Sequence, residues 1–400
     1  MNYAGTIAVD LTGGDTFEGK TIFERTTRWT REAAIDFPNI QFYVSGSGEN
    51  IHDVYFPGNV KRISHTPDEN SLEEIIFSAD KLEIDGIVTH EKARKLQMSL
   101  LGDTKKSNEL QTTTEPKGLQ VVCGLRRPAL IAILPTKFKR KYVIALDVGA
   151  NHWSKPVDLE QYAYLGAIVS KYLFQTSEPK VSLFNMCEES NFGPQEYQEL
   201  HAKLSNAKNL NFIGFTESRH ILGLISHGYL AEENKLPDVV VFEGFCGNEF
   251  IKTIQDSMKL LKEITVQEMF YSPIPVVSQV INYLRAGITL GLNAMPTHRI
   301  LKRLHPKRYG GALLAGVRTA KGRDLVFIKG HGEADRGIYY GIKRAIEYHQ
   351  QGIIRDINQE LEETLMTTDT VKSSDRQRFE ELQKEKIYAK RNNSNAPNQI

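Results

Sequence analysis

The sequence has few cysteines. Cys123, Cys187 and Cys246 are the only three in 400 residues, and they are far apart. An odd number at wide spacing excludes a disulfide framework and is typical of a protein from a reducing compartment. No two of them have the spacing of zinc ligands, and no other motif indicates a cofactor. We therefore expect neither a metal nor a cofactor.

Long apolar runs and an excess of charge of one sign are also lacking. No segment reaches the roughly 20 apolar residues that cross a bilayer. Residues Met1–Gly5 lack the basic start of a signal peptide. Lys and Arg number 50 against 49 Asp and Glu, so no net charge indicates a nucleic-acid-binding surface. We expect a soluble cytoplasmic protein that does not bind nucleic acid.

The most informative stretch is Tyr142–Pro156. Its first part, Tyr142–Leu146, is continuously apolar, as expected of a strand buried on both faces of a parallel sheet. A polar loop follows, in which Gly149 permits a sharp turn, and Pro156 suits the first turn of a helix. This order of strand, polar loop and helix predicts half of a βαβ unit.

The same order recurs along the chain and predicts the fold class. Further strands are expected at Ile7–Asp10, Gln41–Val44, Val60–Ser64, Gly86–Thr89, Ala129–Leu134, Val181–Asn185, Asn211–Gly214, Asp238–Phe242 and Leu325–Ile328. Strands that alternate with helices predict a doubly wound, mainly parallel α/β sheet. We expect an α/β domain over residues 1–352 with a helical excursion at 255–308. The charged, helix-prone residues 353–400 are expected to form a solvated tail that ends in disorder.

Polar loops follow four of the expected strands. These loops are Gly13–Asp15, Asp147–Lys155, Glu243–Asn248 and Lys329–Gly332. Ligands of open α/β sheets bind at the carboxyl ends of the strands, and the ends of parallel strands share one edge. We therefore predict that the four loops converge on one pocket.

A P-loop is an alternative for the first of these loops. Gly14–Thr21 satisfies the pattern G-x4-G-K-[ST], and Val239–Glu243 is similar to a Walker-B strand. However, Asp15 and Glu18 would place negative charge inside a phosphate cradle. The expected strand also ends several residues before Gly14, whereas a P-loop begins where its strand ends. An NTPase is the weakest of the alternatives.

The assembled motifs resemble those of the PlsX family of phosphate acyltransferases. The matching segments follow the family's order from Ile7 to Ile346; they are Ile7–Asp15, Arg127–Leu130, Leu134–Thr136, Leu146–Asn151, Lys155–Pro156, Asp238–Val241, Gly244–Asn248, Lys252–Thr253, Tyr309–Ala312 and Lys329–Gly332. The resemblance implies a homodimer whose fold is related to phosphotransacetylases and isocitrate dehydrogenases. It also implies transfer of an acyl group from acyl carrier protein thioester to inorganic phosphate, giving acyl phosphate for phospholipid synthesis.

The resemblance and the strand-end positions together indicate the site residues. The catalytic candidates are Lys155, Asp147, Asn151, Glu243 and His331. The phosphate- or substrate-binding candidates are Gly13, Gly14, Asp15, Gly149, Gly247, Asn248 and Gly332. Backbone N–H groups and cations at these positions would hold phosphate and stabilise an oxyanion.

Some of these candidates have a second interpretation. Asp147 orients Lys155 or Asn151, or it only caps the following turn. His331 lies between two glycines and equally suits a plain turn. Lys252 and Lys329 are expected to frame the pocket electrostatically.

The chain departs from the family pattern at several positions. Thr89–Lys95 replaces a glycine-rich loop, Phe192 stands where the family has lysine, and Glu243 replaces an aspartate. Loss of a cation and an anion-binding loop weakens transition-state stabilisation. The alternative to the acyltransferase is therefore a catalytically weak or inactive paralogue with a regulatory or assembly role.

Residues 270–295 form an apolar segment in which Arg285 is the only charge. The segment is too short and too often interrupted by Pro and Gly to cross a bilayer. We expect it to be buried in the core or in a dimer partner, with membrane contact at an exposed tip as an addition. The family is similar in using helices here for dimerisation and peripheral membrane contact. Basic residues at 302–308 would then meet anionic headgroups.

Overall fold

We describe the protein from a computed structural model. The described residues are 4–11, 16–17, 20–46, 54–63, 71–90, 118–138, 141–222, 232–270, 311–330, 336–377, 379–381 and 384. Within them the main strands are β1 (Thr6–Asp10), β4 (Gln41–Ser45), β5 (Val60–Arg62), β6 (Gly86–Thr89), β8 (Ala129–Pro135), β9 (Tyr142–Leu146), β10 (Lys180–Phe184), β11 (Asn211–Thr216), β12 (Val239–Val241), β13 (Ala312–Ala315) and β15 (Val326–Lys329).

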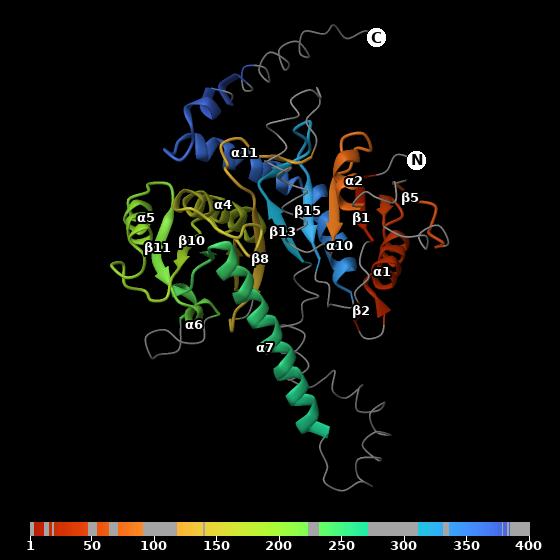
Figure 1. The fold of residues 1–400 in the computed structure, drawn as a ribbon, viewed down its shortest axis with the longest axis horizontal. Coiled ribbons are helices and arrows are strands. Elements are labelled where there is room, and N and C mark those ends of the chain that lie inside the picture. Colours follow the sequence, from red (N-terminus) through yellow and green to blue (C-terminus); the bar gives the residue numbers. More distant parts are fainter. Residues whose placement is uncertain are drawn as a thin grey trace.

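These strands form one 11-stranded sheet over the described part of the chain. Their order is β11-β10-β12-β9-β8-β13-β15-β6-β1-β4-β5 (Figure 1). The strands β9, β12, β10 and β11 are parallel to one another and are called the β9 half. The strands β15, β6, β1, β4 and β5 are likewise parallel and are called the β15 half. The predicted α/β fold with a mainly parallel sheet is confirmed.

The two halves run in opposite directions. Strand β8 is antiparallel to both β9 and β13, and β13 is antiparallel to β15. The predicted single edge shared by all strand ends is therefore wrong for β9 and β15. The reason is local: β8 and β9 are joined by the short segment Thr136–Lys141, which permits a hairpin but not the helical crossover that a parallel pair needs.

The register nevertheless brings the ends of β9 and β15 to the same level. Leu146, the last residue of β9, pairs with Ile131 of β8, which pairs with Leu313 of β13. Leu313 in turn pairs with Ile328, next to the end of β15. The strands β9 and β15 therefore run toward each other from opposite edges of the sheet, and their carboxyl ends lie at the same level.

Helices cover both faces of the sheet. One face packs against α1 (Ile22–Asp36), α4 (Pro156–Phe174), α5 (Gln195–Ser205) and α10 (Gly337–Gln350). The other face packs against α2 (Ser71–Ser78), α6 (Ser218–Ile221) and the first turns of α7 (Gly244–Phe270). Strand β9 shows why its sequence is continuously apolar: Ile144 and Leu146 enter the first core, and Val143 and Ala145 the second.

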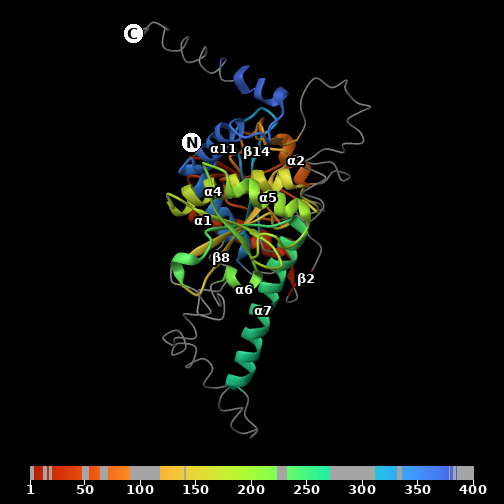
Figure 2. The same ribbon diagram turned by 90° about the vertical axis from the view of Figure 1, so that its left-hand side faces the viewer.

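Helix α7 extends far beyond the sheet. Figures 1 and 2 show its C-terminal part projecting away from the other described elements. Leu260, Leu261 and Ile264 in this part are exposed. Apart from Phe270, the apolar segment 270–295 lies outside the described residues, as do the basic residues at 302–308. No helix in the described ranges is long and apolar enough to cross a membrane.

The P-loop match forms a different structure where it is described. Strand β2 (Thr16–Phe17) pairs antiparallel with β3 (Lys20–Thr21), and α1 begins at the next residue. A phosphate-wrapping loop would lead from a buried strand directly into the helix. This geometry argues against an NTPase.

Helix α11 (Ile353–Met366) corrects the predicted solvated tail. The prediction of a helix was right, but α11 packs against α4 and α10, and Ile357, Leu361 and Leu365 are fully buried. Its apolar residues recur at helical spacing among many charged ones. The prediction of a solvated tail relied on the charged average composition of the segment, which does not reveal this apolar stripe.

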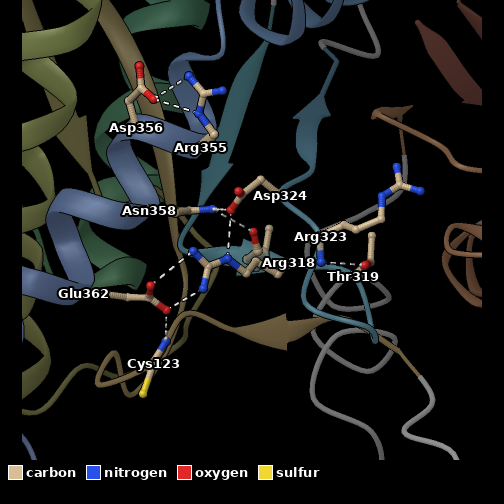
Figure 3. A network of polar contacts seen from close by, with 10 residues as sticks. Cys123, Arg318, Thr319, Arg323, Asp324, Arg355, Asp356, Asn358 and Glu362 are labelled. Carbon is tan, nitrogen blue, oxygen red and sulfur yellow. Dashed lines mark hydrogen bonds and ion pairs between the residues drawn. The ribbon is translucent and has the colours of Figure 1, made fainter. Parts of the chain in front are cut away.

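A polar network fastens α11 to the sheet domain (Figure 3). The guanidinium of Arg318, in the short strand β14 (Val317–Arg318), forms ion pairs with Asp324 at 2.8 Å and with Glu362 of α11. Asn358 of α11 donates to Asp324 at 2.8 Å, and the backbone N–H of Cys123 donates to Glu362 at 3.3 Å. Buried charges are tolerated only when paired in this way.

Replacement of Glu362 by alanine should destabilise the protein. It leaves a largely buried guanidinium with one fewer carboxylate, for which we expect a loss of about 3 kcal/mol in the free energy of unfolding. The exposed neighbour Glu363→Ala should change it by less than about 0.5 kcal/mol. Urea denaturation of both variants measures the difference, and equal stabilities would show that the network does not fasten α11.

Candidate functional site

The turn Asp147–Asn151 follows β9 and is organised by a single carboxylate. Asp147 is fully buried, and its Oδ1 accepts the backbone N–H groups of Leu130 (2.9 Å), Gly149 (3.2 Å) and Ala150 (2.8 Å). Its Oδ2 accepts the backbone and side-chain N–H groups of Asn151, both at 2.8 Å. Burial raises the pKa of Asp147, while these donors act in the opposite direction. With donors on both oxygens, the carboxylate fits this turn only when ionised.

Asn151 is held inside the protein rather than aimed outward. Its amide NH₂ donates to Asp147, to the carbonyl of Pro128 at 2.9 Å and to the hydroxyl of Tyr162 at 2.9 Å. Of the predicted alternatives for Asp147, the structure shows contacts with Asn151 and with the turn itself. Asp147 makes no hydrogen bond with Lys155 in the described part of the chain.

Helix α7 begins in direct contact with this turn, and two glycines make the contact possible. A Cβ on Gly244 would lie 1.9 Å from the carbonyl oxygen of Asn151. A Cβ on Gly247 would lie 2.0 Å from the carbonyl oxygen of Asp147. Gly149, with φ of 112°, lies against Asn248 of the same helix. The predicted groups Asp147–Lys155 and Glu243–Asn248 therefore do lie together.

Glu243 immediately precedes α7 and is buried. Its Oε2 is 3.5 Å from the backbone N–H of Cys246 in the first helical turn. Its Oε1 is buried and has no hydrogen-bond partner among the described residues. Nearby Tyr197 has its pKa raised to about 12 by burial and by the charge of Glu243. A buried carboxylate oxygen without a donor among the described residues is available to a donor group of a ligand.

Two lysines add positive charge from different elements. Lys329, at the end of β15, is partly buried, and burial and the charge of Lys252 on α7 lower the pKa of Lys329. Asp147 acts on the same group in the opposite direction, so these three side chains are close enough to interact electrostatically. Lys252 is exposed and paired with Glu249 at 3.0 Å.

Lys155 lies at the start of α4 and is exposed. Its backbone N–H donates to Asp158 at 2.8 Å, which caps the helix. Its ammonium group forms no ion pair with any described residue. Lys155 is thus placed beyond the buried turn, at the surface.

Gly13, Gly14, Asp15, His331 and Gly332 lie outside the described residues, and so does most of Thr89–Lys95. Their convergence with the turn stays a prediction.

Sequence reasoning missed a polar cluster at the ends of the β15 half. Thr89, at the end of β6, donates its hydroxyl to Asp10 at the end of β1 at 2.7 Å, and both are buried. A Cβ on Gly330 would lie 3.1 Å from the ring of His90. The signal was present, because Asp10 and Thr89 end apolar strands just as Asp147 follows one.

A separate cavity of about 430 Å³ lies beside β10 and β11. It is lined by Glu188, His201, Thr216, His220 and Lys235 among others, and by none of the predicted site residues. Within the described ranges, no cluster of three His, Cys, Asp or Glu side chains is arranged to bind a metal.

Comparison with known sequences gives a consistent result. Residues 117–356 match the family described as "Fatty acid synthesis protein". The chain is 30% identical to a phosphate acyltransferase from Pseudoalteromonas atlantica over 250 residues, which are 62% of this chain and 64% of that relative. It is 27% identical to a phosphate acyltransferase from Thermosipho melanesiensis over 90% of this chain and 96% of that relative. It thus spans less than two thirds of the first relative and almost all of the second.

Among solved structures, a phosphotransacetylase from Streptococcus pyogenes matches with a TM-score of 0.47 and 14% identity, over 88% of this chain and 95% of that one. A branched-chain phosphotransacylase from Enterococcus faecalis matches with a TM-score of 0.41 and 15% identity, over 63% of this chain and 84% of that one.

The contact between α7 and the turn gives a testable prediction. In Gly247→Ala the added methyl group overlaps the carbonyl oxygen of Asp147, so we expect a loss of about 2 kcal/mol or more in the free energy of unfolding. Gly58→Ala is the matched control, because a Cβ there meets no atom within 4 Å. Chemical denaturation of the two variants tests this, and a Gly247→Ala protein as stable as the control would mean that α7 does not need this close approach.

Proposed function

Because the chain belongs to the fatty acid synthesis protein family, we propose that it is an acyltransferase that moves an acyl group from acyl carrier protein thioester to inorganic phosphate. The family match covers more than half of the chain and confirms the resemblance to PlsX. Relatives named phosphate acyltransferase support phosphate as the acceptor. The proposed product is an acyl phosphate for phospholipid synthesis.

The observation that carries the proposal is the junction of α7, the turn Asp147–Asn151 and Lys329. The first N–H groups of a helix carry partial positive charge and favour an anion. Lys252, which is also paired with Glu249, and Lys329 add positive charge from two different elements. A phosphate dianion fits this combination of a helix start and two cations better than a neutral ligand does.

The reaction balances without a cofactor. An oxygen of hydrogen phosphate attacks the thioester carbonyl, a C–O bond forms, and the C–S bond of the tetrahedral intermediate breaks. The proton of hydrogen phosphate passes to the departing thiolate, so that the products are acyl phosphate and free thiol. Donors placed around the developing oxyanion supply the main stabilisation.

We assign the proton transfer to Glu243. Its Oε1 is buried without a described donor, next to the start of α7, where phosphate would lie. It can accept the P–OH proton and pass it to the thiolate. General acid–base groups need this proximity to the proton that they move.

The other predicted residues have supporting roles in this proposal. Asp147 and Asn151 are positioning residues, because their side chains hydrogen-bond to each other and hold the turn in place. Gly247 and Gly149 permit the close approach of α7 to the turn, and Asn248 lies against Gly149. Lys155 contacts substrate from the surface. The roles of Gly13–Asp15, His331 and Gly332 rest on their motifs alone.

Assembly is part of the same proposal. We assign the exposed apolar residues of α7, Leu260, Leu261 and Ile264, to contact with a second copy of the chain or with a membrane surface. Acyl carrier protein would deliver the thioester to the site. No observation favours the inactive paralogue.

The assay follows the loss of thioester from palmitoyl acyl carrier protein, with and without phosphate. Phosphate-dependent loss is expected, and Glu243→Gln should lower kcat about 100-fold because the proton acceptor is removed. Glu233→Gln, an exposed acid in the segment before β12, is the control and should keep full activity. If the folded parent protein consumes no thioester, the proposed function is wrong; if Glu243→Gln is fully active, the role of Glu243 is wrong.

The lowered pKa of Lys329 predicts a pH dependence. Phosphate binding needs the protonated lysine, and that form is lost at a lower pH than for an ordinary lysine. The KM for phosphate should therefore rise on the alkaline side before an ordinary lysine titrates. Lys329→Arg keeps its charge and should move this rise to higher pH. Identical pH profiles for the two proteins would exclude Lys329 from phosphate binding.

A further inference from the structure

Three neighbouring strands of the β9 half are each followed, in a loop or in the first turn of a helix, by an exposed large apolar side chain. Met186 and Phe192 follow β10, Phe245 follows β12, and Trp153 follows β9. Trp153 is 79% exposed and Phe245 60%. Single exposed apolar residues are ordinary, but a set at the carboxyl ends of adjacent parallel strands lies where α/β sheets bind ligands.

Hydrogen bonds fix the backbone beneath these side chains. The buried Asn185 accepts the backbone N–H of Met186 at 2.9 Å and donates to the carbonyl of Phe192 at 3.1 Å. The carbonyl of Trp153 accepts Arg127 at 3.0 Å. These positions are therefore held by the fold.

The same loops lie close to one another. Gly244 lies directly against the carbonyl of Asn151. Phe245 is the residue after Gly244, and Trp153 is two residues after Asn151, so both side chains start close to this contact. Phe184, at the end of β10, stacks on Phe242 with ring centroids 4.6 Å apart and contacts Phe250 of α7 at 6.1 Å, so the chain after β10 leaves the sheet beside the start of α7. The apolar side chains thus border the start of α7.

We propose that Trp153 and Phe245, extended by Met186 and Phe192, form the surface that binds the acyl chain of the thioester substrate. The inference rests on the proposed function, because that function places the thioester carbonyl at the start of α7. The acyl chain is bonded directly to that carbonyl and is the apolar part of the substrate, so it extends onto the adjoining apolar surface.

Kinetics with two chain lengths test the proposal. Trp153→Ala should raise the KM for palmitoyl acyl carrier protein about tenfold, and leave the KM for acetyl acyl carrier protein and for phosphate unchanged. Trp153→Phe keeps the aromatic surface and should restore most of the affinity. Tyr55→Ala is the control, because Tyr55 is 78% exposed and precedes β5, at the other end of the sheet from β9.

Tryptophan fluorescence gives a readout that does not need turnover. The sequence has two tryptophans, and Trp29 is 2% exposed, so a change in the solvent exposure of tryptophan reports Trp153. The probe is palmitoyl pantetheine with an amide in place of the thioester, and its acetyl counterpart is the control. The palmitoyl probe should shift the emission of the parent protein to shorter wavelength, and the acetyl probe should not. Neither probe should shift the emission of Trp153→Phe.

The outcomes separate this inference from the proposed function. A palmitoyl-dependent shift without catalytic turnover supports the apolar surface and contradicts the acyltransferase. Turnover without a chain-dependent shift overturns the inference and leaves the acyltransferase. An equal rise of KM for palmitoyl and acetyl substrates in Trp153→Ala also overturns it, because that result indicates docking of the carrier protein itself.

Discussion

The buried carboxylate of Asp147 is the interaction on which the rest of the site depends. It gathers donors from the turn Asp147–Asn151 and from Leu130 of β8, and so joins two strands to one loop. The resulting rigid turn presents carbonyl oxygens so close to α7 that only glycine is accommodated at Gly244 and Gly247. The position of the helix start, and with it the proposed anion site, follows from this carboxylate. Such buried networks specify geometry because an unpaired member is costly.

Much of the fold could be predicted because its signals are local. The apolar run Tyr142–Leu146 is buried on both faces, and Pro156 begins a helix, as the residue types indicate. The direction of a strand cannot be read from its apolar pattern alone. The antiparallel strands β8 and β13 in the middle of the sheet follow from short connections, and the apolar patterns of β8 and β9 look alike in either direction. The burial of α11 was missed for a related reason, because its partner α4 lies far away in the sequence.

The candidate site was predictable in its residue types more than in their roles. Polar residues after strands led to Asp147, Asn151 and Glu243, which the structure places around one helix start. Their hydrogen-bond partners could not be inferred, and the partners decide that Asn151 faces inward while Lys155 lies outside. The proximity of Lys329 depends on a register that runs through four strands. No pattern in the sequence encodes that register directly.

The order of the strands in the two halves has a consequence for how the protein folds. Strand β15 is the neighbour of β6 in the sheet, yet most of the chain separates them, and β12 is inserted beside β9 only after β10 and β11 have been made. Closing such long loops costs entropy before the native contacts compensate it, so these pairings form late and slowly. During synthesis the first half of the chain emerges with β6 able to pair with β1 but still lacking β15 on its other side. The proposed anion site is therefore a product of completed folding, and an unfinished chain exposes strand edges that must be kept from pairing with other chains.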